Sequence, residues 1–152
     1  MAIVWDNSLE IGIKVIDQQH MRIVEFINEL EQAKNNNDQQ AIADVLNDCV
    51  DYTLSHFAFE ESLQEEAGYK FCKPHKKVHE LFTRRIQEYV ERFELGDDIT
   101  TELHTMLSRW IINHIKHDDA DYVDCVKANL ESNGHGDKEK HSGKSWFNRL
   151  FG

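Results

Sequence analysis

The sequence contains few of the residues that interrupt helices. Its 152 residues include one proline and seven glycines. Long helices can therefore run without a break, and an all-β fold with many tight turns is disfavoured. No apolar run approaches the roughly 20 residues that cross a bilayer, and the N-terminus lacks the basic and apolar regions of a signal peptide. The length suits one domain with a substantial core, and we expect a cytoplasmic protein.

Cysteine and positive charge are also scarce. Cys49, Cys72 and Cys125 are odd in number and form no CxxC motif. This pattern indicates free thiols in a reducing compartment, with a metal–thiolate site as the minority alternative. The 17 Lys and Arg are outnumbered by 28 Asp and Glu, which gives a net charge of −11. Nucleic-acid binding is disfavoured because it requires clustered Lys and Arg, and the acidic excess identifies no other partner.

Apolar residues recur at steps of three and four along most of the chain, which predicts helices. The helices are expected over residues 17–34, 38–67, 71–94 and 100–130. Asp17, Asp38 and either Asp98 or Thr100 are the expected N-caps, and Gly68 the expected end of the second helix. Short connections predict an all-α, up-down four-helix bundle, with an N-terminal arm over residues 1–16 packed across one end.

We expect the bundle to occupy residues 1–130. Residues 131–143 are polar and contain glycine, which predicts a flexible linker. Residues 144–152 form a short aromatic segment in which Trp146 and Leu150 are four residues apart, beside Lys144 and Arg149. We expect an amphipathic tail that docks on a membrane surface or a partner protein. The alternative is a frayed tail that packs on its own bundle.

Histidines and acids interrupt the predicted apolar faces. His56 and Glu60 lie four residues apart, as do His75 and His79. On a helix this spacing places both side chains of a pair on one face, one turn apart. The first helix carries a further histidine on its apolar face, and the fourth carries another that is followed by an aspartate. Imidazole and carboxylate bind divalent transition metals, which would offset the cost of burying such groups.

One buried histidine is more often a hydrogen-bonded core residue than a metal ligand. The metal interpretation gains weight because the candidates fall on the core faces of all four helices. Five histidines and two acids exceed the four ligands of a tetrahedral zinc. They suit two octahedral ions that share bridging carboxylates. Ligation by nitrogen and oxygen fits iron or manganese, and the spacing does not choose between these metals.

Residues 1 to about 128 resemble the bacterial hemerythrins, which are oxygen-binding non-haem di-iron proteins. The resemblance rests on Val4-Trp5-Asp6, Ile11-Gly12-Ile13, Ile16-Asp17-Gln18-Gln19-His20, His56-x-x-x-Glu60, Gly68-Tyr69, His75-x-x-x-His79 and Trp110-x-x-x-His114-Ile115-x-x-x-Asp119. A single HxxxE or HxxxH motif carries little information. The complete series, in order and at these separations, is highly specific. It implies reversible O₂ binding by a carrier, store, delivery protein or sensor, and not an enzyme.

The resemblance also implies a role for each ligand. The implied ligand set is His20, His56, Glu60, His75, His79, His114 and Asp119. The three histidines of the third and fourth helices would complete one six-coordinate iron. The two histidines of the first and second helices would leave one position open for O₂ on the other iron. The two carboxylates would bridge the irons together with an oxo or hydroxo group.

One ligand is ambiguous from helix geometry alone. Asp119 lies five residues beyond His114, which rotates it about 140° around an ideal helix. Asp118 and His117 would lie closer to the face of His114. The helical period therefore favours Asp118 as the ligand, whereas the resemblance favours Asp119.

Apolar residues next to the ligands are candidates for the wall of an O₂ pocket. These residues are Phe57, Phe59, Trp110 and Ile111. Such a wall would exclude water and slow autoxidation, although the same residues could serve only to pack the bundle. A di-iron oxidase or peroxidase is one rival function, but oxygen-activating bundle sites usually contain more carboxylates. The other rivals are an iron or redox sensor that acts through a partner and a metal-free interaction bundle.

Overall fold

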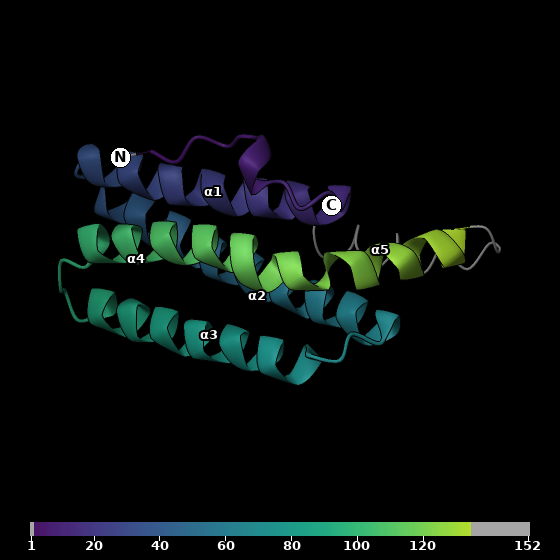
Figure 1. The fold of residues 1–152 in the computed structure, drawn as a ribbon. Coiled ribbons are helices and arrows are strands. Elements are labelled where there is room, and N and C mark those ends of the chain that lie inside the picture. The colour runs from purple at the N-terminus through teal and green to yellow at the C-terminus, as the bar shows by residue number, and fades with distance from the viewer. Residues whose placement is uncertain (1, 135–152) are drawn as a thin grey trace.

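The computed structural model describes residues 2–134, which form a bundle of helices (Figure 1). The elements are η1 (Asn7–Leu9), α1 (Lys14–Asn35), α2 (Gln39–Ala67), α3 (Cys72–Glu94), α4 (Thr100–Asn113), η2 (His114–Asp119) and α5 (Ala120–Gly134). Helices α1 to α4 lie side by side, and α5 continues beyond α4 (Figure 1). The predicted four-helix bundle is confirmed, with its fourth rod formed by α4, η2 and α5.

Apolar side chains from the four rods meet along the bundle axis. Ile27, Leu46, Ile86 and Leu103 all belong to one buried cluster. Full burial of a side chain of this size stabilises the fold by roughly 1.5–3 kcal/mol. Helix α1 packs against α2 and α4, while α2 also packs against α3 and α5. Each predicted apolar face therefore has a partner, and the polar residues on those faces are brought into the interior.

The N-terminal arm lies along α1 and not across the end of the bundle (Figure 1). The backbone N–H of Ile3 donates to Asn28 Oδ1 at 2.8 Å, and Asn28 Nδ2 donates to the carbonyl of Ile3 at 2.9 Å. Trp5 and Ile11 pack against the main apolar cluster. The predicted path over the bundle end is wrong because the arm is held by a side chain in the middle of α1.

The predicted caps are partly confirmed. Asp38 accepts a hydrogen bond from the backbone N–H of Ala41, and Gly68 ends α2 in the left-handed region at φ 71°. Asp17, however, lies within the first turn of α1. Its carboxylate accepts the backbone N–H groups of Ile11 and Gly12, which precede the helix, at 2.8 and 3.1 Å. Helix α4 begins after an isoleucine and has no side-chain cap, so the cap predicted at residue 98 or 100 is wrong.

The C-terminal rod extends beyond its predicted end. Helix α5 runs to Gly134, so residues 131–134 are helical although they were expected to begin the linker. The remainder of that linker and the predicted tail over 144–152 lie outside the described residues. Among residues 2–134, no helix is long and apolar enough to cross a membrane.

Candidate metal centre

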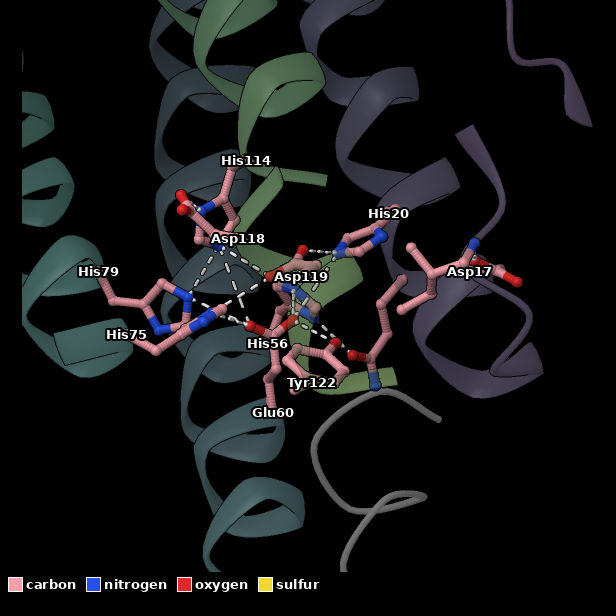
Figure 2. Close-up of polar contacts among 12 residues, drawn as sticks. Asp17, His20, His56, Glu60, His75, His79, His114, Asp118, Asp119 and Tyr122 are labelled. Carbon is pink, nitrogen blue, oxygen red and sulfur yellow. Dashed lines mark hydrogen bonds and ion pairs between the residues drawn. The ribbon is translucent and has the colours of Figure 1, made fainter. Parts of the chain in front are cut away.

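All seven predicted ligands converge at the centre of the bundle (Figure 2). Their side chains are buried, with at most 5% of any residue exposed. They form two overlapping groups, within each of which one ligand atom per residue lies within 4.8 Å of the others. The groups are Glu60, His75, His79, His114 and Asp119, and His20, His56 and Glu60. Every rod of the bundle contributes at least one of these residues.

A π-helical turn brings the last carboxylate into the cluster. The segment η2 runs from His114 to Asp119 and is a π-helix, in which the backbone hydrogen bonds join residues five apart. Asp119 therefore returns to the face of His114, and its Oδ1 lies 3.1 Å from His114 Nε2. Asp118 lies on the outer side, where its Oδ2 is 2.8 Å from His114 Nδ1. The ordinary 3.6-residue period, which would place Asp118 closer to the face of His114, does not hold through this segment.

The two oxygens of Glu60 face different histidines. Oε1 lies 2.8 Å from His75 Nε2 and 3.2 Å from His79 Nε2. Oε2 lies 3.2 Å from His56 Nε2 and 3.8 Å from His20 Nε2. One oxygen thus faces the histidines of α3, and the other faces those of α1 and α2.

The two oxygens of Asp119 also face different histidines. Its Oδ1 lies 3.2 Å from His75 Nε2 and 3.1 Å from His114 Nε2. Its Oδ2 lies 3.0 Å from His20 Nε2. Both buried carboxylates therefore present one oxygen to each of two sets of imidazoles, which is the arrangement that a bridging ligand requires.

The positions of the imidazole nitrogens suit metal binding better than hydrogen bonding between the histidines. The Nε2 atoms of His79 and His114 are 3.0 Å apart, so a proton is needed between two lone pairs. The Nε2 atoms of His20 and His56 are buried and face carboxylate oxygens, at 3.0 Å from Asp119 Oδ2 and 3.2 Å from Glu60 Oε2 respectively. Metal ions would accept these lone pairs and neutralise the carboxylates. The donor set therefore fits bound metal.

Without metal, protons on the buried histidines balance the charge of the two carboxylates. Burial alone lowers the pKa of His20, but hydrogen bonds and charges from Asp119 and Glu60 outweigh it and raise that pKa to about 9. The same opposition raises the pKa of His75 to about 10. For His114, burial is outweighed by the Asp119 charge and the hydrogen bond to a neighbouring aspartate, and its pKa rises to about 9. These three imidazoles are therefore protonated at neutral pH when no metal is bound.

The carboxylates are correspondingly held in their ionised form. Burial would raise the pKa of Glu60, but the charge of His56 and hydrogen bonds from His20 and His75 hold it well below its usual value. The pKa of Asp119 is also lowered, since its neighbouring imidazoles outweigh burial and the charge of Glu60. Both carboxylates are available as metal ligands throughout the neutral range.

The free energy of unfolding of the metal-free protein is expected to fall as pH rises from about 6.5 to about 10. Three histidines have folded-state pKa values of about 9 to 10, above the ordinary value of 6.5. A raised pKa stabilises the fold fully below the unfolded-state value, and that stabilisation is lost as pH rises through the folded-state value. Urea unfolding of the metal-free protein at several pH values measures the slope.

Metal binding is expected to show the opposite pH dependence. The three protonated imidazoles must lose their protons to bind metal, so binding at pH 7 is expected to release about three protons. Metal affinity then rises with pH where the stability of the metal-free protein falls. Titration in a weakly buffered indicator solution counts the protons, and release of none would contradict the assignment.

Three contacts around the cluster were not assigned from the sequence. Gln19 Oε1 lies 2.6 Å from His56 Nδ1, and the Tyr122 hydroxyl donates to Glu60 Oε2 at 3.1 Å. The third contact is that of Asp118 with His114. Tyr122 continues the apolar periodicity of the fourth helix, and that pattern gives no sign that its hydroxyl reaches Glu60. Gln19 directly precedes a predicted ligand. The sequence does not show that this glutamine is buried, and only the structure reveals its contact with His56.

The four apolar pocket candidates occupy different places. Phe57 stacks on His79 with ring centroids 3.8 Å apart, and Trp110 stacks on His114 at 4.2 Å. Ile111 is buried in the main cluster, whereas Phe59 packs in a second cluster. Phe57 and Trp110 thus cover histidines of the set that the resemblance gives to the six-coordinate iron. A role for the four residues in an O₂ pocket remains a prediction.

A four-helix bundle with five buried histidines and two buried carboxylates defines a metal-binding helical protein with nitrogen and oxygen ligands. Residues 11–126 match the family model described as the hemerythrin HHE cation binding domain. The chain belongs to the hemerythrin family, as the resemblance in its sequence motifs implied.

Bacteriohemerythrins from two organisms are similar to this chain over most of its length. The chain is 51% identical over 149 residues to the bacteriohemerythrin of Stenotrophomonas maltophilia (strain R551-3), covering 98% of this chain and 95% of that one. It is 56% identical over 128 residues to the bacteriohemerythrin of Pseudomonas aeruginosa (strain LESB58), covering 84% of each. A crystal structure of wild-type hemerythrin matches with a TM-score of 0.79 at 23% identity, covering 83% of this chain and 98% of that one, which supports the fold.

Proposed function

We propose that this protein binds O₂ reversibly at a pair of non-haem irons and serves as an oxygen carrier, store, delivery protein or sensor. Membership of the hemerythrin family supports this function. The observation that carries it is the division of both buried carboxylates, Glu60 and Asp119, between two sets of imidazoles. Such a division suits two ions held side by side.

The proposed ligands follow from that division. His75, His79 and His114 would hold one iron, His20 and His56 would hold the other, and Glu60 and Asp119 would be the carboxylates that the two irons share. Bound at these residues, an iron pair would supply reversible electron transfer to O₂. The iron with two histidines has fewer protein ligands and is the proposed binding position.

The chain supports this chemistry by fixing the ligands with hydrogen bonds and by shielding them from bulk water. The Tyr122 hydroxyl fixes Glu60 Oε2, and Asp118 fixes the ring of His114 through Nδ1. Aromatic rings stack on two of the imidazoles and keep bulk water from them. Because the ligands are at most 5% exposed, the site favours a diatomic ligand over an organic substrate. This supports a carrier over an oxidase or peroxidase.

Replacing Trp110 by Gln is expected to speed autoxidation of the iron-loaded protein by roughly tenfold. The Trp110 ring stacks on His114 at 4.2 Å and on Phe82 at 3.6 Å, so a polar side chain would admit water beside a ligand. Trp110→Phe, which keeps an apolar ring, serves as the control. The rate is followed by the decay of the oxygenated optical spectrum in air, and equal rates for all three proteins would count against this role.

The proposed function is tested by optical spectroscopy of the iron-loaded protein. The protein is reduced without oxygen, exposed to air and then returned to an oxygen-free atmosphere. A visible absorption band that forms in air and disappears when O₂ is removed supports a carrier. Irreversible bleaching accompanied by turnover of an added reductant would instead indicate an oxidase or peroxidase.

A further inference from the structure

Helix α1 contributes more to the metal centre than its one predicted ligand. Gln19 directly precedes His20 in α1, and it is 1% exposed. Its Oε1 lies 2.6 Å from Nδ1 of His56, which belongs to α2 and is also 1% exposed. One short stretch of α1 is therefore linked to both histidines of the two-histidine set. It contains His20, and its Gln19 side chain contacts His56.

Metal binding determines the direction of this hydrogen bond. Nε2 of His56 faces Glu60 Oε2 at 3.2 Å and is the nitrogen that lies in the cluster. If Nε2 presents its lone pair to a metal, the ring proton is on Nδ1, and Nδ1–H donates to Gln19 Oε1. The amide oxygen of Gln19 then fixes both the ring orientation and the tautomer of His56.

The opposite side of the centre uses a different acceptor. Nδ1 of His114 lies 2.8 Å from Oδ2 of Asp118, which is a carboxylate. A carboxylate acceptor makes an imidazole a stronger electron donor to its metal than a neutral amide does. The two histidine sets therefore differ in the charge of the groups behind them as well as in the number of their ligands.

We propose that Gln19 is a positioning residue that orients His56 toward the iron and, as a neutral acceptor, keeps that iron easier to reduce than a carboxylate would. This inference rests on the proposed function, which assigns His56 to the iron with the open position. It predicts that the neutrality of Gln19 favours the ferrous state, and with it the release of O₂.

The test compares Gln19→Leu, which removes the acceptor, with Gln19→Glu, which keeps an acceptor but adds charge. Gln18→Leu is the matched control because Gln18 is the exposed neighbour on the same helix. Each protein is loaded with Fe²⁺ without oxygen, and its iron loss to a ferrous chelator and its reduction potential are measured. In Gln19→Leu, one of two irons is expected to leave about 10- to 100-fold faster than in the wild type. Gln19→Glu is expected to keep both irons and to have a lower reduction potential.

Three results would overturn the inference. They are wild-type iron loss in Gln19→Leu, an equal acceleration in Gln18→Leu, and an unchanged or higher potential in Gln19→Glu. Failure of the wild-type protein to take up two irons would overturn the proposed function and this inference together. If the wild type takes up two irons but the Gln19 variants match it in iron loss and reduction potential, only the role of Gln19 is overturned.

Discussion

Replacing Glu60 by Gln is expected to weaken metal binding by at least about 100-fold and to leave no stable pair of ions. Glu60 is fully buried, and its two oxygens lie within 3.2 Å of imidazole nitrogens from two different helices. The amide is nearly the same size but carries no negative charge, and its NH₂ group cannot be a ligand. Because loss of groups outside the ligand set already costs 10- to 100-fold, loss of a shared ligand should cost more.

Metal content after gel filtration and the affinity for Fe²⁺ without oxygen measure this effect. Glu66→Gln is the control because Glu66 is exposed on the same helix and its replacement removes the same charge. The circular dichroism of Glu60→Gln shows whether the helices remain folded without metal. Two ions bound to Glu60→Gln with an affinity within about threefold of the wild type would contradict the bridging role of Glu60.

Asp119 and Asp118 are neighbours, yet their replacements are expected to differ strongly. Asp119→Asn should weaken metal binding by at least about 100-fold, because both oxygens of this fully buried carboxylate face imidazole Nε2 atoms. Asp118→Asn should cost only about tenfold, since Asp118 contacts Nδ1 of His114 and is outside the ligand set. Both variants remove one negative charge, so each controls for the other.

The order of the two effects tests the π-helical turn directly. Measured iron affinities for the two variants give that order without further assumptions. A larger loss in Asp118→Asn would mean that the fourth rod keeps the ordinary 3.6-residue period through this segment. It would also return the bridging role to the residue that helix geometry alone favours.

The common face of each candidate ligand pair could be predicted because these pairs follow the ordinary helical period. His56 with Glu60, and His75 with His79, are four residues apart within regular helices, where spacing alone fixes a common face. The π-turn from His114 could not be predicted in this way. Its five-residue hydrogen bonding is a local exception to the period, and the apolar pattern on either side reads as one continuous helix.

The remaining differences arise from contacts between residues distant in sequence or between a side chain and the backbone. The path of the arm depends on Ile3 and Asn28, which are 25 residues apart. Asp17 was predicted as an N-cap because aspartate accepts backbone N–H groups, but it accepts those of Ile11 and Gly12 from within the first turn. Gln19 is polar and precedes the candidate ligand His20, and only the packing of α1 against α2 shows that Gln19 reaches His56.

The most direct test of the central claim is the amount of O₂ taken up and released by the reduced, iron-loaded protein. A protein that binds O₂ reversibly at a pair of irons is expected to take up one O₂ for every two irons. It should release all of that O₂ when the gas phase is exchanged for argon, and should repeat the cycle. Consumption of O₂ that is not recovered, or no uptake by protein with two bound irons, would contradict reversible O₂ binding at this site.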